Sequence, residues 1–215
     1  MAEWPIAVVL KTTVGAIRPR VRIPAPPLTQ HDPTRPGDAV TTLYQRLLGE
    51  RFDALHPVLR RFHSSETHIV GRGLFRVVHH PGWFRKLLLV VLRFPRAGEA
   101  IEVRLEVSPS EAGERWVRAF PGRPLVTRQT AEGGMLMERG GPLCFGLAVE
   151  VVEGGLTFRT RRTWMLGVPL PSWFAPRVDA DVVPNGEAWN VAVRLRLPLV
   201  GRLLDYEGEV VPQWT

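Results

Sequence analysis

Cysteine and lysine are both scarce in this chain, and each scarcity excludes a class of site. The single cysteine, Cys144, excludes an internal disulfide and a metal site built from several cysteines. It lies in the apolar run PLCFGLAVEV, which predicts a small buried side chain and not a nucleophile. Only Lys11 and Lys86 are lysines among 28 basic residues, and no run of five basic residues occurs. Despite the net charge of +7, we therefore expect no nucleic-acid partner, and a weak contact with an anionic membrane surface fits better.

Long apolar runs and familiar catalytic motifs are also missing. No apolar stretch approaches the roughly 20 residues that span a bilayer. The start, MAEWPIAVVLKTTVG, has an acid before its short apolar run, so it is a poor signal peptide and we expect a cytoplasmic protein. The segment Gly71-Arg72-Gly73 lacks the third glycine of a dinucleotide-binding turn, and there is no phosphate loop, GxSxG or HExxH motif. We accordingly predict no cofactor and assign no catalytic residue.

The histidines are few and cluster early in the chain. They occupy positions 31, 56, 63, 68, 79 and 80, before the half that is rich in strand patterns. His63 and His68 flank a polar turn, and His79 and His80 precede Pro81-Gly82, which predicts solvated loop residues. Their spacing does not bring them near a carboxylate, so we predict no metal site.

Proline and glycine are abundant, with 20 of each, which favours many turns over long helices. Seven prolines fall in residues 1–37, where IRPRVRIPAPPL is incompatible with a helix or a central strand. We predict an extended arm over 1–37, with IAVVL or VRI as edge strands; a wholly disordered tail is the alternative. The length of 215 residues suits one further domain, a single β-rich domain over 38–215.

Three short helices are predicted before and within the first strands. Asp38 is a plausible N-cap for AVTTLYQRLLG, and Asp53 for ALHPVLRRFH, each with apolar residues at helical spacing. The segment 83–92 in PGWFRKLLLVVLRFP is apolar nearly all round. This pattern predicts a short buried helix, or one that lies on a rim or a membrane surface.

From Ile69 onward the apolar period changes to two. AIEVRLEV and AWNVAVRLRLPLV alternate cleanly, and Glu153-Gly154-Gly155 is a good hairpin signal between PLCFGLAVEVV and GLTFRTRRTWML. Repeated strands with helices in one region predict a mostly β (α+β) fold. We expect an antiparallel β-barrel or half-barrel of about eight or nine strands with two or three short helices.

The segment ERWVRAF places an arginine between two aromatic residues on one face of a strand. Trp116, Arg118 and Phe120 point one way, so either this face is exposed or Arg118 points inward and has a partner. Because a lone buried charge is very costly, we predict that Arg118 pairs with Glu138, which follows three apolar residues.

Two other charges fall among apolar strand residues. Arg162 shares a predicted face with Phe158 and Trp164, and Asp205 precedes Tyr206, so Arg162 or Asp205 is the predicted third member of the pair. The structural interpretation is a salt bridge that fixes sheet register, or arginines that extend to the sheet rim. The functional interpretation is a polar end in an apolar pocket, where Arg118 binds a carboxylate, phosphate or carbonyl. The predicted ligand-binding residues are Trp116, Arg118, Phe120, Glu138, Phe158, Arg162, Trp164 and Tyr206.

A stiff apolar loop is predicted over WMLGVPLPSWFAP, residues 164–176, which contains three prolines and several large apolar residues. One interpretation is a loop that packs over the barrel end. The other is a lid or rim over a ligand cavity, meeting the apolar helix at 83–92.

The same motifs, in the same order, carry a family resemblance. LYQRLLGERFDALHPVLRRFH, WVRAFPG, MLMERGGPL, GVPLPSWFAP and PLVGRLLDYEGEV resemble an uncharacterised bacterial family, the domain of unknown function numbered 4166, over roughly residues 39–212. The family's W-x-R-x-F and E-R-x-G-P patterns fall on Trp116, Arg118, Phe120, Glu138, Arg139, Gly141 and Pro142. The resemblance implies no activity. It does imply association with a saccharopine-dehydrogenase-like Rossmann domain, often fused in this family and missing here, so such a reductase would be a separate protein.

Three functions remain compatible with these observations. The leading hypothesis is a non-enzymatic binding module whose barrel encloses an apolar pocket for a lipid-like or polyketide-like small molecule. The second is an accessory subunit that docks onto a separate nicotinamide-dependent reductase through the apolar helix and the 164–176 loop. The third is an enzyme in which Arg118, Glu138 and Tyr206 act on a bound carbonyl compound.

Overall fold

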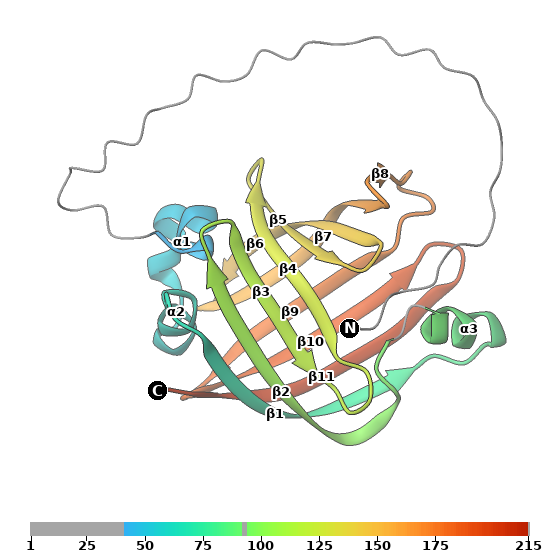
Figure 1. Cartoon of the computed structure of the whole chain (residues 1–215), viewed down its shortest axis with the longest axis horizontal. Helices are drawn as coiled ribbons and strands as arrows, with labels where there is room; N and C mark the ends of the chain where they lie inside the picture. Colours follow the sequence, from blue (N-terminus) through green and yellow to red (C-terminus); the bar gives the residue numbers. More distant parts are fainter. Residues whose placement is uncertain (1–40, 92–93, 215) are drawn as a thin grey trace, which may run out of the picture. The chain divides into compact units, whose positions relative to one another are not determined.

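A computed structural model describes residues 41–91 and 94–214 of the chain. The predicted arm at 1–37, the predicted cap Asp38 and the last residue of the predicted helix at 83–92 lie outside the described residues. The described residues form short helices and one large antiparallel sheet (Figure 1).

The helices before the sheet begin later than the sequence indicates. Helix α1 spans Leu43–Leu48, the 3-10 helix η1 spans Gly49–Ala54, and α2 spans Pro57–His63. Thr42 caps α1 through a reciprocal capping box with Gln45. The prediction that Asp53 caps the next helix is wrong: His56 is the N-cap, because Pro57 has no N–H to donate and suits the first helical position.

Helix α3, Trp83–Val91, confirms the predicted helix but not its burial. Leu89 is buried, whereas Trp83, Phe84, Leu87 and Val90 are exposed. Of the two interpretations of this segment, the buried helix is therefore wrong, and the helix lies on a surface.

The sheet contains ten long strands and one very short one. Its strands are β1 Ile69–His79, β2 Gly98–Ser110, β3 Gly113–Ala119, β4 Leu125–Glu132, β5 Met135–Gly140, β6 Leu143–Val152, β7 Gly155–Met165, β8 Val168–Pro169, β9 Arg177–Asn185, β10 Ala188–Leu197 and β11 Gly201–Gln213. Every pairing is antiparallel, and β8 pairs only with β7. Pairing of β6 with β7 and of β1 with β11 closes the ten long strands into a barrel.

The barrel prediction is thus confirmed and the predicted strand count is too low. The strand missed by pattern is β9, RVDADVVPN, which contains aspartate and proline residues that strands usually disfavour. In the structure Asp179 and Asp181 lie on the outer face of β9 and form ion pairs with arginines of β7 and β10, so their charges do not enter the core. The predicted hairpin at Glu153-Gly154 is confirmed, and both residues have positive φ, as a type I′ turn requires.

Successive strands run up and down, so the connections alternate between the two ends of the barrel. Helices α1 and α2 lie at one end, with the hairpins β2–β3, β4–β5, β6–β7 and β9–β10 (Figure 1). Helix α3 lies at the other end, with the connections β3–β4, β5–β6, β7–β9 and β10–β11. We call the connections at this second end the α3 rim: residues 80–91, 94–97, 120–124, 141–142, 166–176 and 198–200.

The period-two pattern places apolar residues in the lumen. Val103, Leu105 and Val107 on β2 are buried, as predicted, and so are Trp189 and Val193 on β10. A β-bulge interrupts this pattern in β7. Gly146 and Leu147 of β6 pair with Arg162 and Thr160, so β7 contains one extra residue at this point. Residues of β7 after the bulge therefore face the opposite way from the simple alternation.

Two glycines allow close contact where the barrel closes between β1 and β11. A Cβ on Gly208 would lie 2.4 Å from the carbonyl oxygen of Leu74, and a Cβ on Gly73 would lie 2.2 Å from that of Glu209. The ring of Phe75 occupies the space beside both glycines. These positions explain the glycines in the first and last strands as a close approach of backbones.

Candidate ligand-binding site in the barrel lumen

The predicted pair of Arg118 and Glu138 is present, and it lies inside the barrel. Arg118 on β3 donates from Nη2 to Oε1 of Glu138 on β5 at 3.2 Å, and from Nη1 to Oγ1 of Thr127 at 3.1 Å. Thr127, on the strand between them, donates to the same Oε1 at 2.8 Å. Burial by itself lowers the pKa of Arg118, but the carboxylate of Glu138 outweighs it and the pKa is raised, so the guanidinium stays charged.

A second group of polar residues lies next to the Arg118–Glu138 pair, on the side nearer α2. The guanidinium of Arg118 lies over the ring of Trp116, with 5.2 Å between Cζ and the ring centroid. Trp116 donates a hydrogen bond from Nε1 to Oε2 of Glu114 at 2.8 Å. Opposite Glu114 on β4, Gln129 accepts a hydrogen bond from the Tyr44 hydroxyl at 3.0 Å. Burial raises the pKa of Glu114 to about 7, more than the Trp116 hydrogen bond lowers it.

Aromatic residues of the helices complete this end of the lumen. His63, at the end of α2, lies 3.8 Å from Tyr44 and 6.2 Å from Trp116 between ring centroids. Phe62 contacts Trp116 edge to face at 5.8 Å. The prediction that His63 is a solvated loop residue is wrong: α2 packs it into the core, and burial lowers its pKa from 6.5 to about 3. The Nδ1 atom of His63 is buried without a hydrogen-bond partner.

On the rim side of the pair lies an aromatic cluster. Phe120 contacts Tyr206 at 5.8 Å and Phe75 at 5.9 Å between ring centroids, and all three side chains are buried. Burial raises the pKa of Tyr206, and the positive charge of Arg118 only partly opposes this. Aromatic rings therefore lie on both sides of the Arg118–Glu138 pair along the barrel axis. The pair is a charged group between these rings.

The structure separates the other predicted site residues. Phe158 is buried and faces the lumen, paired with Val149 and Ala180. Trp164 and Arg162 come after the β7 bulge, pair with Cys144 and Gly146, and lie on the outside of the barrel, where Arg162 is exposed. The prediction that Arg162 shares a face with Phe158 is wrong because the bulge reverses the alternation.

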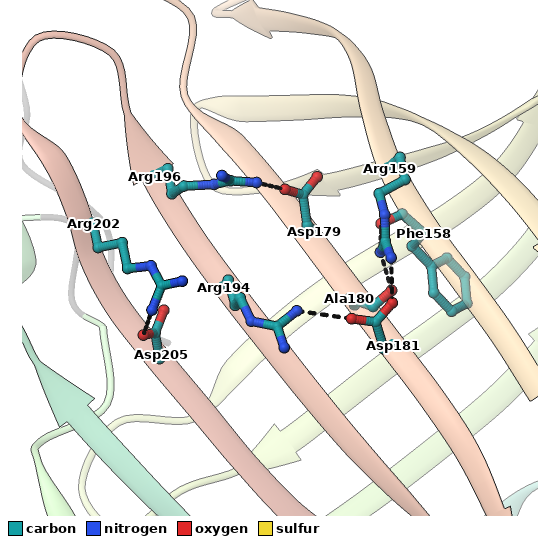
Figure 2. Close-up of polar contacts among 9 residues, drawn as sticks. All are labelled: Phe158, Arg159, Asp179, Ala180, Asp181, Arg194, Arg196, Arg202 and Asp205. Carbon is teal, nitrogen blue, oxygen red and sulfur yellow. Dashed lines mark hydrogen bonds and ion pairs between the residues drawn. The ribbon is translucent and has the colours of Figure 1, made fainter.

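Asp205 is also outside, in a ladder of charges across the outer face. Figure 2 shows Arg196 with Asp179, Arg202 with Asp205, and Asp181 between Arg159 and Arg194. The pairs of Asp179 and Asp181 link β9 to β7 and β10, whereas the Arg202–Asp205 pair lies within β11. The prediction of Asp205 as a third partner of Arg118 is therefore wrong, since its neighbour Tyr206 takes the inward position. Exposed pairs of this kind contribute little each and mainly favour the observed register.

Several lumen side chains are only partly buried even though the barrel is closed. The side chains of Arg118 and Glu138 are 18% and 16% exposed, and the inward-facing Phe145, Val182 and Val191 are also only partly buried. Two hollows of the described residues lie elsewhere. One of about 380 Å³ lies beside α1 and η1, and one of about 220 Å³ lies on the outer face over β1, β10 and β11; neither contains the Arg118–Glu138 pair.

Sequence reasoning missed Glu114, Thr127, Gln129, Tyr44 and His63. Glu114 could have been found, because it lies two residues before Trp116 and shares its face by simple alternation. Gln129 and Thr127 alternate in the same way on β4, but nothing in the sequence indicates which strand pairs with β3 at that height. Tyr44 and His63 reach the lumen only because the helices pack across its end.

The described residues lack two further kinds of feature. No group of three or more His, Cys, Asp or Glu side chains in residues 41–91 and 94–214 could hold a metal ion. No described helix is long and apolar enough to cross a membrane.

Comparison with known proteins places the chain in a family. No curated protein and no solved structure matches it. A family model matches residues 55–210, which contain nine of the ten barrel strands, most of β11 and both members of the Arg118–Glu138 pair. The chain belongs to the family described as Domain of unknown function (DUF4166).

Proposed function

We propose that this protein is a non-enzymatic binding module that holds a lipid-like or polyketide-like molecule with one anionic end in the barrel lumen. The observation that supports this most is the partly exposed Arg118–Glu138 pair inside a closed barrel. Arg118 would bind the anionic end, while Trp116, Phe120, Phe158 and Tyr206 would contact the apolar part.

Barrel size supports the proposal. Side chains fill the interior of a barrel of about eight strands or leave room for one small ligand, and larger barrels enclose ligand cavities. Ten strands close this barrel, and several inward-facing side chains remain partly exposed. The lining of the lumen therefore has the composition of a ligand site, with many apolar and few polar side chains.

The chemistry of the pair supports an anionic ligand end. Arg118 donates to Glu138 and Thr127 and has further N–H donors. It can therefore bind a second anion, because its planar guanidinium suits carboxylate and phosphate groups. The alternative in which Tyr206 acts as an acid is less well supported, because a general acid is most efficient when its pKa lies near the working pH. Burial raises the pKa of Tyr206 away from neutrality.

The first experiment is native mass spectrometry of the freshly purified full chain, with solvent extraction of any bound molecule. We expect a discrete extra mass that leaves on denaturation and has an apolar chain with an anionic group. The second is titration of the delipidated chain with oleate and with oleyl alcohol, which differ in charge at the head group. Oleate should bind at least about tenfold more tightly, the contribution of one charge-assisted hydrogen bond.

Variants of the pair separate a ligand role from a structural one. Arg118→Met leaves Glu138 unpaired and should destabilise the fold, whereas the double variant Arg118→Met/Glu138→Leu removes both charges and should be nearly neutral for stability. The folded double variant should lose the preference for oleate and keep binding of oleyl alcohol. Arg128→Met, an exposed arginine on β4, is the matched control. If the wild type carries no molecule and binds neither probe, the proposal is wrong.

A further inference from the structure

Exposed apolar side chains are concentrated at one end of the barrel. Of the fourteen large apolar side chains exposed among the described residues, nine lie in the α3 rim. They include every exposed tryptophan and phenylalanine of the described chain: Trp83, Phe84, Trp173 and Phe174. Leu166 is 80% exposed and Leu199 87%, each at a turn with positive φ. An exposed apolar patch of this extent indicates a contact surface.

Acidic residues are absent from the sequence of one end of the barrel and present at the other. The sequence of the α3 rim, together with residues 92 and 93, contains no acidic residue. The basic residues of the rim include Arg85, Lys86, Arg96 and Arg123. Each hairpin at the opposite end carries a glutamate at or beside its turn: Glu111, Glu132, Glu153 and Glu187. The rim thus carries basic groups without acids, whereas the opposite end carries both signs, with glutamates at its hairpins and arginines on α1, η1 and α2.

Hydrogen bonds join three of the five connections of the rim, those that follow β1, β3 and β10. The guanidinium of Arg85 on α3 donates from Nε to the carbonyl of Val200 in the β10–β11 connection at 3.0 Å. Arg123 in the β3–β4 connection donates to the carbonyl of Phe94, just beyond α3, at 3.1 Å. The backbone N–H of His80 donates to the carbonyl of Leu203 at 3.1 Å. The exposed apolar groups of α3 and of the β10–β11 connection are therefore held next to each other by hydrogen bonds.

We propose that the α3 rim is a docking surface for lipid bilayers that carry anionic lipids. Aromatic side chains favour the level of the lipid head groups, and basic residues are attracted to anionic leaflets. A helix with exposed apolar residues beside cations is typical of segments that lie in the membrane interface. The lack of acidic groups favours a bilayer over a protein partner, whose surface would offer both signs of charge.

Vesicle co-sedimentation of the full chain tests the docking surface. The probes are vesicles of phosphatidylcholine alone and vesicles with about a third phosphatidylglycerol. Wild-type protein should sediment with the anionic vesicles, and binding should weaken strongly at about 0.5 M salt because the Debye length shortens. Trp83→Ser/Trp173→Ser and Lys86→Glu/Arg123→Gln should each lower the affinity at least about tenfold.

Matched controls lie on the sides of the barrel. Leu74→Ser/Val183→Ser removes two apolar side chains of similar exposure, and Arg72→Glu/Arg128→Gln changes two exposed arginines. Both controls should bind anionic vesicles as the wild type does, and all variants should keep the wild-type circular dichroism spectrum. Oleate binding in the lumen should be unchanged in the rim variants, so failure of docking and failure of ligand binding are distinguishable.

Three results would overturn the proposal. The first is no sedimentation with either vesicle. The second is equal binding by the rim variants and the controls. The third is capture of a reductase by the wild type that depends on Trp83 and Trp173, without vesicle binding, which would assign the α3 rim to a protein partner.

Discussion

Glu114 and His63 show how burial of single ionisable residues controls the stability of this fold. Both side chains lie beside Trp116 at the helix end of the lumen, and both are nearly inaccessible to water. Burial favours the neutral form of each, which raises the pKa of the acid and lowers that of the base. The two residues therefore make stability depend on pH with opposite signs.

Glu114 should make the protein less stable as the pH rises. Its pKa is about 7 in the folded chain against an ordinary value of 4.5, so the unfolded chain loses its proton first. Below about pH 4.5 the protonated side chain makes its full contribution to the free energy of unfolding. This contribution declines through pH 7 by up to about 3 kcal/mol. Urea unfolding of the wild type and Glu114→Gln at pH 5 and pH 8 should show the variant gaining relative stability at pH 8. Parallel pH profiles would contradict this.

His63 should make the protein less stable as the pH falls. Its pKa is about 3 in the folded chain against an ordinary value of 6.5, so the unfolded chain takes up a proton that the folded chain excludes. Between pH 6.5 and pH 4.5 the free energy of unfolding should fall by about 2 to 3 kcal/mol.

The variant His63→Phe should flatten this acid slope in urea unfolding at pH 4.5 and 6.5. An aromatic ring still fits against Tyr44 and Trp116, and the buried Nδ1 has no partner to lose. His68→Gln, at an exposed histidine, is the control and should keep the wild-type slope. An unchanged slope in His63→Phe would show that other groups cause the acid sensitivity.

At the scale of elements, the contact between β1 and β11 decides whether the sheet closes. The hydrogen-bonded register brings Phe75 opposite Gly208, and the ring lies where a Cβ would be. Closure removes both sheet edges, which would otherwise present unpaired backbone groups.

Gly208→Ala should lower the melting temperature by roughly 5 °C or more. The added Cβ would lie 2.4 Å from the Leu74 carbonyl oxygen and 2.7 Å from the Phe75 ring, so backbone must shift, at a cost of about 2 kcal/mol. Gly98→Ala is the control, because its Cβ would meet only the flexible side chain of Ile101 at 3.0 Å. Thermal unfolding followed by circular dichroism measures both, and equal melting temperatures would refute a close contact at this position.

At the scale of the whole molecule, a ligand in the lumen should stabilise the barrel. A ligand that binds only the folded chain adds about 2.7 kcal/mol at a hundredfold excess over its Kd, which is roughly 5 to 10 °C for a chain of this size. Oleate should therefore raise the melting temperature of the wild type. The shift should be smaller in Arg118→Met/Glu138→Leu and unchanged in Arg128→Met. A wild type without any shift would argue against a ligand in the lumen.

The sequence by itself determined the strand pattern, the barrel class and the Arg118–Glu138 pair. Alternation fixes the face of each residue within one strand, and an inward arginine requires a nearby carboxylate. The same alternation failed at Arg162 because one extra residue in β7 reverses the faces. It failed at β9 because outward aspartates hid a strand that burial of its other face stabilises.

Only the tertiary structure decided closure of the barrel, the count of ten strands and the gathering of distant residues. Local sequence patterns do not indicate that β1 pairs with β11, because this pairing joins the first and last strands of the sheet. Tyr44 and His63 became lumen residues because helix packing buries them. The apolar and basic groups of the α3 rim come from four separate connections, and they lie at one end only because an up-and-down barrel brings alternate connections to the same end.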